Sequence, residues 1–315
     1  MERITRVVGL ALCATAAGCG SCAPDRALPK RNVTAQAIAS SAADDVPPTA
    51  SQARRTTMPC RAIAADGEVR LQTDDGGVVV SLQDELEPGH WIWLSPDARL
   101  VAKDPRTSRE TTFRGLGHVQ PCVGRTEESW VTSGTFESTA GAGEMPGAEQ
   151  WVVTPLGVVR FGAGRVTIDA PAGSNTVEVE VPSATAFVWP AQDASVRGPD
   201  GGGASAASDE GWLRVSRTSA TLIRPARRPP PEGARAAIEA CRTAGRTAHE
   251  LAGALVGADA SGKTAAAQVT ARRLARAACA VAAIRVDSLF DRAGKEALSE
   301  SLKEADALWR TLPVP

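Results

Sequence analysis

The run Val177-Glu178-Val179-Glu180-Val181 alternates strictly between apolar and acidic residues. A period of two is typical of a β-strand that buries one face and exposes the other. Glu178 and Glu180 therefore share a face, and we interpret them as a solvated surface rather than as an acid–base pair. This strand indicates the fold class of the first two thirds of the chain.

Similar short runs recur on both sides of this strand. Turn dipeptides such as Asp66-Gly67 and Pro88-Gly89 separate them at short intervals, and helical periodicity is absent. We therefore expect a mainly β domain over residues 58–225, arranged as a β-roll, barrel or sandwich. The other expected strands lie at residues 68–71, 78–82, 91–94, 130–131, 151–153, 158–161, 166–168 and 212–223.

A second pattern begins after a Pro/Arg linker at residues 226–233. Apolar residues then recur at steps of three and four in three successive stripes, with breaks at Gly257 and Gly294. Such stripes are typical of amphipathic helices that share one core. We expect a small all-α domain, a three-helix bundle, over residues 234–312.

Four cysteines fall in these two domains, namely Cys60, Cys122, Cys241 and Cys279. None forms a C-x-x-C pair, so the spacing favours two disulfides over a zinc or thioredoxin-like site. Cys241 and Cys279 each lie 19 residues from Ala260. An antiparallel helical hairpin turning there would place them at one level, so we predict a Cys241–Cys279 disulfide. The other pair, if joined, ties the start of the β domain to its middle.

The first 18 residues have the layout of a signal peptide, with Arg3 and Arg6 ahead of a short apolar run. The ending Ala16-Ala17-Gly18-Cys19 resembles a bacterial lipobox, which usually has Leu at the place of Ala16. The resemblance implies that the Cys19 thiol carries a palmitate-class lipid, a diacylglycerol, and anchors the protein to a membrane. An ordinary secretory signal is the alternative. Gly20 replaces the Asp that marks inner-membrane retention in some lipoproteins, which favours the outer membrane.

Residues 19–57 are rich in Ala, Ser, Thr, Pro and Arg and show no apolar periodicity. We interpret them as a disordered tether with a reach of about 30 Å. A lipid anchor, a tether and paired cysteines together predict a periplasmic or surface location in the cell envelope. No apolar run after the signal peptide is long enough for a transmembrane helix.

Part of the β region resembles the FecR domain, over roughly residues 62–190. The likeness rests on the strand Trp130-Val131-Thr132-Ser133-Gly134-Thr135-Phe136, on Val153-Thr154-Pro155-Leu156-Gly157, and on Gly162. It implies an all-β, roll-like extracytoplasmic module. The chain departs from the family pattern at Gly162-Ala163-Gly164-Arg165-Val166, which lacks the usual Gly-Thr-x-Phe, and at Val181-Pro182-Ser183, which replaces a later glycine.

One motif imitates a nucleotide site. Residues 257–264 fit G-x-x-x-x-G-K-T, whose chemistry needs a strand before the loop and a helix after it. Here helical stripes lie on both sides, so we expect a turn between two helices and no bound nucleotide. The three histidines, His90, His118 and His249, show neither metal-ligand spacing nor a nucleophile beside them. We therefore expect no catalytic, cofactor-binding or metal site.

Trp91 and Trp93 share one face of their expected strand. A buried pair would anchor the core, whereas an exposed pair would form a flat platform for stacking a sugar. The core interpretation is favoured, and Trp130, Trp151, Trp189 and Trp212 are read in the same way.

Charge is unevenly divided along the chain. Residues 58–225 hold 14 Lys and Arg against 22 Asp and Glu, and residues 226–315 hold 14 against 10. The opposite signs predict a modest, salt-sensitive attraction between the two domains. The overall net charge of −1 argues against a nucleic-acid partner.

These features predict a non-enzymatic, envelope-anchored interaction, sensing or scaffold module. Its partners would be the membrane, through the lipid on Cys19, and an envelope protein or cell-wall component. Two alternatives stay open, a cell-wall or polysaccharide binder that uses an exposed Trp platform, and a cryptic enzyme.

Overall fold

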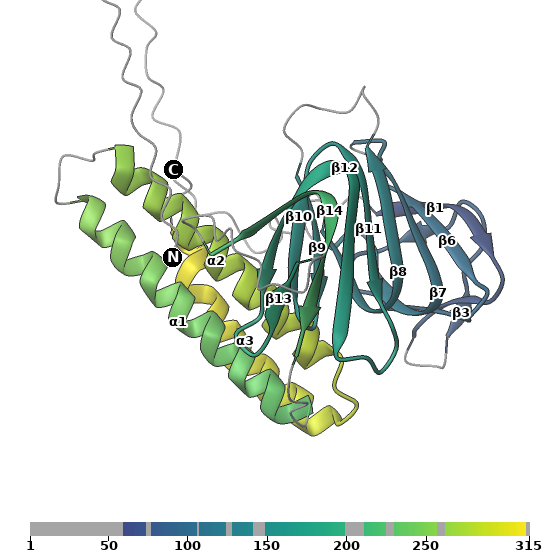
Figure 1. Cartoon of the computed structure of the whole chain (residues 1–315). Helices are drawn as coiled ribbons and strands as arrows, with labels where there is room; N and C mark the ends of the chain where they lie inside the picture. Colours follow the sequence, from purple (N-terminus) through teal and green to yellow (C-terminus); the bar gives the residue numbers. More distant parts are fainter. Residues whose placement is uncertain are drawn as a thin grey trace, which may run out of the picture. The chain divides into compact units, whose positions relative to one another are not determined.

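The computed structural model describes residues 59–73, 77–105, 107–123, 128–140, 149–198, 211–224, 230–256 and 262–312. Within these residues fourteen strands join in one hydrogen-bonded sheet, and three helices follow it in the chain (Figure 1). The mainly β part and the small helical part expected from sequence are both present. The expected signal peptide, the tether and Cys19 lie outside the described residues. The strands are β1 (Cys60–Asp66), β2 (Val69–Leu71), β3 (Val78–Val79), β4 (Glu85–Leu86), β5 (Ile92–Leu94), β6 (Arg99–Lys103), β7 (Glu110–Gln120), β8 (Glu128–Ala140), β9 (Gln150–Thr154), β10 (Gly157–Phe161), β11 (Gly164–Ala170), β12 (Thr176–Pro190), β13 (Ser195–Arg197) and β14 (Leu213–Ile223).

The sheet closes on itself around β8. This strand pairs with β9 at one end and with β11 at the other, and β9, β10, β12 and β11 follow one another by antiparallel pairing. The β8–β9 pair is the parallel one. Closure of this kind removes open sheet edges on that side of the fold. On the far side β7 leads through β5 and β2 to β3, and through β6 to β1 and β4.

The long strands β7 and β8 bend together where their pairing register shifts, between Arg114 and His118. Gly134 sits at this bend with a φ of +100°. A Cβ atom there would lie 2.9 Å from the Cα of Gly117, so the close approach of the two strands requires glycine.

The interior of the β part is a single apolar core. Phe113, Phe136 and Phe161 are fully buried in it and meet edge to face, with ring centroids 5.7 and 6.1 Å apart. Strand β12 contributes its valines to this core and exposes Glu178 and Glu180, as its alternation predicts.

Strands β9 and β10 are buried on both faces. Val152 and Val159 point into the β core, whereas Trp151, Val153 and Val158 belong to a second apolar cluster shared with the helices. Coverage on both sides explains why these strands read as continuous apolar runs rather than as alternating ones.

The helices are α1 (Pro230–Val256), α2 (Gly262–Asp287) and α3 (Arg292–Arg310). They pack against each other and along one side of the sheet (Figure 1). Helix α1 begins inside the expected linker, because proline suits the first turn of a helix. The expected break at Gly294 is wrong, since this glycine lies in the first turn of α3 and donates to the Asp291 cap.

The two disulfides follow the predicted pairing. Cys241 joins Cys279 with a Cα–Cα distance of 4.5 Å, at one level of the α1–α2 hairpin. Cys60 joins Cys122 at 6.0 Å, which links the start of β1 to the segment after β7. The residues before and after the G-x-x-x-x-G-K-T segment are helical, in α1 and α2, whereas a phosphate-binding loop follows a strand.

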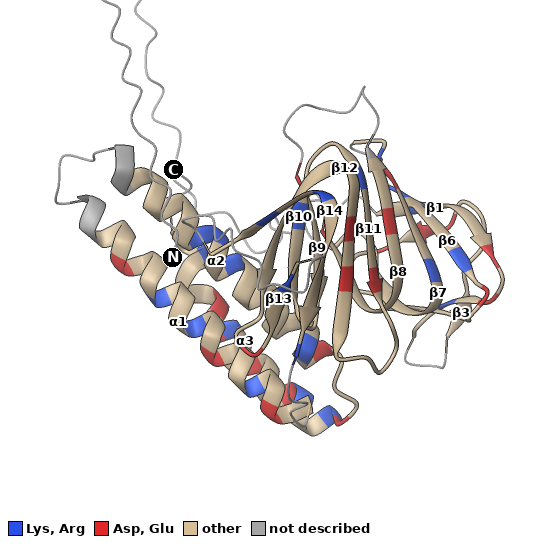
Figure 2. Ribbon diagram, in the orientation of Figure 1, with Lys and Arg blue, Asp and Glu red and all other residues tan. Residues whose placement is uncertain are grey.

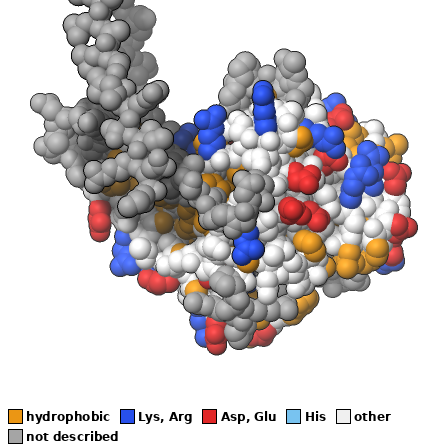
Figure 3. All heavy atoms as spheres, in the orientation of Figure 1, with side chains coloured by type: hydrophobic (Ala, Val, Ile, Leu, Met, Phe, Trp, Pro, Cys, Tyr) orange, Lys and Arg blue, Asp and Glu red, His pale blue; other side chains and the backbone are white. Residues whose placement is uncertain are grey.

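Acidic and basic residues are mixed over the face of the sheet seen in Figures 2 and 3. Glu137 of β8, for example, pairs with Arg165 at 2.7 Å and approaches Arg114 at 3.9 Å. Both signs are therefore interspersed on this face, and neighbouring charges offset one another.

Candidate functional site: a pocket between the sheet and the helices

The turn between β9 and β10 is built from the Thr-Pro-x-Gly segment singled out in the sequence. The Thr154 hydroxyl donates to the Gly157 carbonyl at 3.0 Å and accepts from the Leu156 amide at 3.3 Å. These bonds hold the turn so that the Pro155 carbonyl can accept hydrogen bonds from outside it. A Cβ at Gly157 would collide with the Trp189 carbonyl oxygen, so glycine lets β12 pass directly beside the turn.

Arg285 of α2 reaches this turn and fixes the helices to the sheet. Its Nε donates to the Pro155 carbonyl at 2.9 Å, and its Nη1 donates to the Gly233 carbonyl of α1 at 3.1 Å. Its Nη2 pairs with Asp193 at 2.6 Å, in the segment between β12 and β13. Arg224, after β14, also donates to Pro155 and lies 3.3 Å from Asp193. We call Arg285, Asp193, Arg224 and the Pro155 carbonyl the Arg285 network.

The network keeps its carboxylate ionised. Burial opposes the charge on Asp193, but the hydrogen bond and charge of Arg285, together with the charge of Arg224, outweigh it. The pKa of Asp193 is therefore held below its ordinary value. Because these charged side chains are mostly buried, removing one partner would leave another uncompensated.

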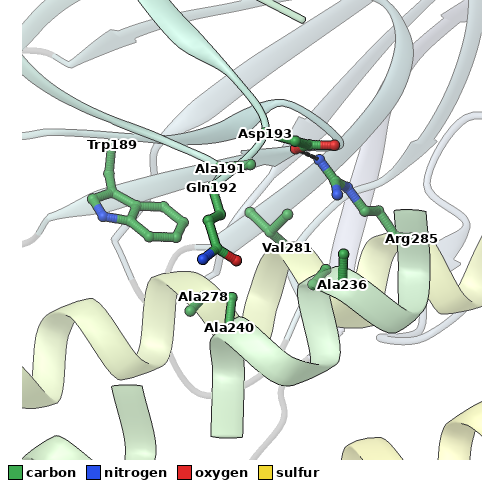
Figure 4. Close-up of a pocket in the computed structure, with 10 residues that line it drawn as sticks. Trp189, Ala191, Gln192, Asp193, Ala236, Ala240, Ala278, Val281 and Arg285 are labelled. Atoms are coloured by element: carbon green, nitrogen blue, oxygen red, sulfur yellow. Dashed lines mark hydrogen bonds and ion pairs between the residues drawn. The ribbon is translucent and has the colours of Figure 1, made fainter. Parts of the chain in front are cut away.

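A cavity of about 340 Å³ opens beside the network, between the end of β12 and helices α1 and α2 (Figure 4). We call it the Trp189 pocket. The Trp189 indole forms one wall, and the side chain of Gln192 points into the space toward the helices. The Arg285–Asp193 pair closes the other end. The helical side is lined by Ala236, Ala237, Ala240, Ala278 and Val281.

Two polar groups in the pocket make no hydrogen bond to any residue that the structure describes: the indole Nε1 of the half-buried Trp189 and the amide of the exposed Gln192. Beside them, Arg285 and Asp193 are paired with each other at 2.6 Å. The pocket therefore offers free neutral donors and acceptors next to small apolar side chains. Such a mixture can bind a small uncharged group and can orient it.

The two tryptophans considered as a possible platform, Trp91 and Trp93, are placed differently from each other. Trp91 is 7 % exposed, stacks on the His118 ring at 4.2 Å, and donates its Nε1 hydrogen to Asp287 of α2. Trp93 is 38 % exposed. The structure therefore places Trp91 under the helices and leaves only Trp93 facing solvent, so the two rings do not share an open surface.

A second set of contacts joins α2 and α3 to the sheet around Asp287. Its carboxylate accepts from Gln120 of β7 at 3.0 Å and pairs with Lys295 of α3 at 2.5 Å. Burial lowers the pKa of the neighbouring His118; the charge of Asp287 opposes this change and the charge of Lys295 reinforces it. The His118 ring stacks on Trp91, and its two nitrogens lie 3.1 Å from the Thr132 hydroxyl and the Gln72 side-chain oxygen.

The cysteine pairs occupy structural positions. The sulfur atoms of Cys60 and Cys122 lie within 4.8 Å of a carboxylate oxygen of Asp104, but in a disulfide they are not thiolate ligands. Cys241 and Cys279 lie inside the helical bundle.

No protein-family model and no curated protein matches this chain. Among the described residues, none of the three helices has an apolar stretch long enough to cross a bilayer.

The sequence pointed only partly to this site. It marked the Thr-Pro-x-Gly turn, but it treated Trp189 as core and did not select Gln192 or Asp193. One signal was available, because Arg285 interrupts the apolar stripe of α2 and a lone charge in such a stripe needs a buried partner. Its partner, 92 residues away, could not be read from the pattern.

Proposed function

We propose that this chain is a non-enzymatic binding module of the bacterial cell envelope, anchored by a lipid on Cys19, whose ligand enters the Trp189 pocket. The observation that carries the proposal is that Trp189 and Gln192 have polar groups without a hydrogen bond to any described residue, beside the paired charges of Arg285 and Asp193. Catalysis by general acids and bases uses groups that can exchange protons with a substrate. In this pocket Asp193 and Arg285 instead hold two parts of the fold together.

We further propose that the β part is a FecR-like module. The Thr-Pro-x-Gly segment supports this, since it forms a turn in which the Thr154 hydroxyl makes two hydrogen bonds and Gly157 allows the close approach of β12. In this proposal the module senses or scaffolds a partner, and the helices supply one wall of its binding site.

The anchor is tested with Cys19→Ala in the full chain. A lipoprotein with this change should remain as precursor or be released, whereas the wild type should fractionate with membranes, and with the outer membrane in particular. Membrane partition and processing identical to the wild type would contradict lipidation at Cys19.

The binding site is tested by cross-linking the full chain to isolated envelopes. Ala240→Trp fills the pocket, and Gln192→Ala removes its free amide with less change in shape. Ala307→Trp, on an exposed part of α3, is the matched control. Loss of cross-links in both pocket variants, with retention in the control, is the expected result. Retention in all three variants would place the ligand elsewhere.

The alternative of a polysaccharide binder with a surface platform now depends on Trp93, which is exposed. Trp93→Ala separates it from the pocket proposal, because only a surface platform would lose its ligand with this substitution.

A further inference from the structure

We propose that the Trp189 pocket recognises an uncharged sugar that carries an acetamido group, the chemical class found in N-acetylated cell-wall glycans. This inference rests on the proposed function above, since it names the ligand of that same site. Four properties of the pocket lead to it.

The first property is neutrality. Arg285 and Asp193 are the charged residues that line the pocket, and their side chains lie 2.6 Å apart. The Arg285 guanidinium also donates to two carbonyl groups, Pro155 and Gly233. A free anion would have to compete with Asp193, and a cation would have to displace Arg285. The pocket therefore favours a ligand without net charge.

The second property is its aromatic wall. Trp189 lines the cavity with an indole ring that is only partly buried. The face of an indole offers a broad apolar surface, and its Nε1 offers a hydrogen-bond donor at the edge. A pyranose ring has the complementary pattern, with an apolar C–H face and hydroxyl groups around its rim.

The third property is the small apolar surface opposite. Ala236, Ala240 and Ala278 present methyl groups from two neighbouring helices, and their short side chains leave the space open. An acetamido methyl group can pack in this space and is stabilised there by apolar burial.

The fourth property is the Gln192 amide, which projects between the indole and the alanines (Figure 4). A primary amide both donates and accepts, as does the secondary amide of an acetamido group, so the two can pair. An apolar side chain from a protein partner would fill the same space but would bury this amide without a hydrogen-bond partner, which is unfavourable.

The cavity is also of suitable size. A volume of about 340 Å³ falls at the lower end of the range for small-molecule sites, roughly 300–1,000 Å³. It suits one substituted sugar ring, with the remainder of a glycan chain lying outside.

The experiment uses the purified full chain labelled with 5-fluorotryptophan, so that each indole gives its own ¹⁹F resonance. Trp189→Phe assigns the resonance of interest. The probe is chitotriose, the trimer of N-acetylglucosamine, and the matched probe is cellotriose, which has the same backbone without acetamido groups.

We expect chitotriose to move the Trp189 resonance in a saturable manner and cellotriose to move it weakly or not at all. Gln192→Ala should weaken chitotriose binding about tenfold, the effect of losing one good hydrogen bond to a neutral group. Ala240→Trp should abolish it, and Ala307→Trp should leave it unchanged. Equal responses to both sugars, a response at Trp93 instead, or no response at all would overturn the inference.

The envelope cross-linking separates this inference from the proposed function. If Gln192→Ala and Ala240→Trp lose their envelope cross-links while chitotriose does not bind, the site binds something other than an acetamido sugar and the broader proposal survives. Cross-links to a protein that persist after glycan digestion would also show that the site binds something other than an acetamido sugar. If the pocket variants keep their cross-links, the broader proposal fails as well.

Discussion

Arg285 in α2 and Asp193 after β12 form an ion pair, with Nη2 2.6 Å from Oδ1, that connects the helices to the sheet. Their side chains are only 7 % and 11 % exposed. This buried and specific pair lies beside the apolar cluster that the helices share with the sheet. The attraction between the two parts expected from their overall charges stays a prediction.

Asp193→Ala should destabilise the protein by about 3–5 kcal/mol, because it leaves the buried Arg285 guanidinium without its carboxylate. Urea unfolding followed by circular dichroism measures the change. Arg292→Ala is the control, since Arg292 forms an exposed pair with Glu296 and should cost less than about 1 kcal/mol. The double variant Asp193→Ala/Arg285→Met should regain part of the lost stability, because it no longer buries an unpaired guanidinium. Equal effects of Asp193→Ala and Arg292→Ala would contradict the role of the network.

His118 should make stability fall in mild acid. Burial lowers its pKa in the folded state, so the unfolded chain takes up its proton first as the pH decreases. The stabilising contribution is fully present above the ordinary pKa of 6.5 and is lost as the pH falls from there through the lower folded-state pKa. His118→Phe keeps a ring stacked on Trp91 but cannot titrate. The free energy of unfolding, measured between about pH 7 and pH 5, should therefore decline less in this variant. An identical decline would show that other groups carry the dependence.

The disulfide between Cys241 and Cys279 should stabilise the helical hairpin. Closing a loop with a sequence separation of 38 is worth about 4 kcal/mol in the chain-entropy model. The double variant Cys241→Ser/Cys279→Ser should lose a stability of this order, as measured by chemical unfolding. Peptide mapping without reduction provides the direct check, and a disulfide from Cys241 to any other cysteine would refute the hairpin register.

Gly157→Ala should destabilise the fold by about 1–3 kcal/mol, since the added methyl group collides with the Trp189 carbonyl and lies 2.8 Å from Leu222. Gly162→Ala is the matched control, because no atom lies within 4 Å of its added Cβ. Thermal melts of the two variants should therefore differ clearly. The same substitution should also shift the Trp189 resonance without ligand, since β12 has to move.

The β part, the helical part and the pairing of Cys241 with Cys279 could be predicted because each leaves a pattern between residues close together in the sequence. Alternation in β12 and apolar stripes in α1 and α2 are short-range signals, and Cys241 and Cys279 fall on the helical stripes. Strand β7 was not predicted, because Gly115 and Gly117 interrupt its alternation. These glycines serve the bend against β8, a property of two strands together that neither strand reveals alone.

The Trp189 pocket depends on contacts between segments that lie even farther apart in the sequence. Trp189 resembles a core residue in sequence, and only the placement of the α1–α2 hairpin leaves its ring and the Gln192 amide beside an open space. The same holds for Trp91 and Trp93. The helices cover Trp91, which is buried, whereas Trp93 stays exposed. Which face a helix covers is decided by tertiary packing rather than by strand periodicity.

The disulfide at the start of the β part has a mechanical consequence. A protein held by its N-terminal side and pulled through a bound ligand experiences tension, and that tension enters the fold at Cys60, where β1 begins. The covalent bond to Cys122 carries the force directly to the segment before β8. The intervening loop, with a sequence separation of 62, is bypassed, so β1 cannot be peeled from β4 and β6 while the bond is intact. After reduction of this disulfide, the chain between Cys60 and Cys122 would bear the force, and the module would extend in a longer step.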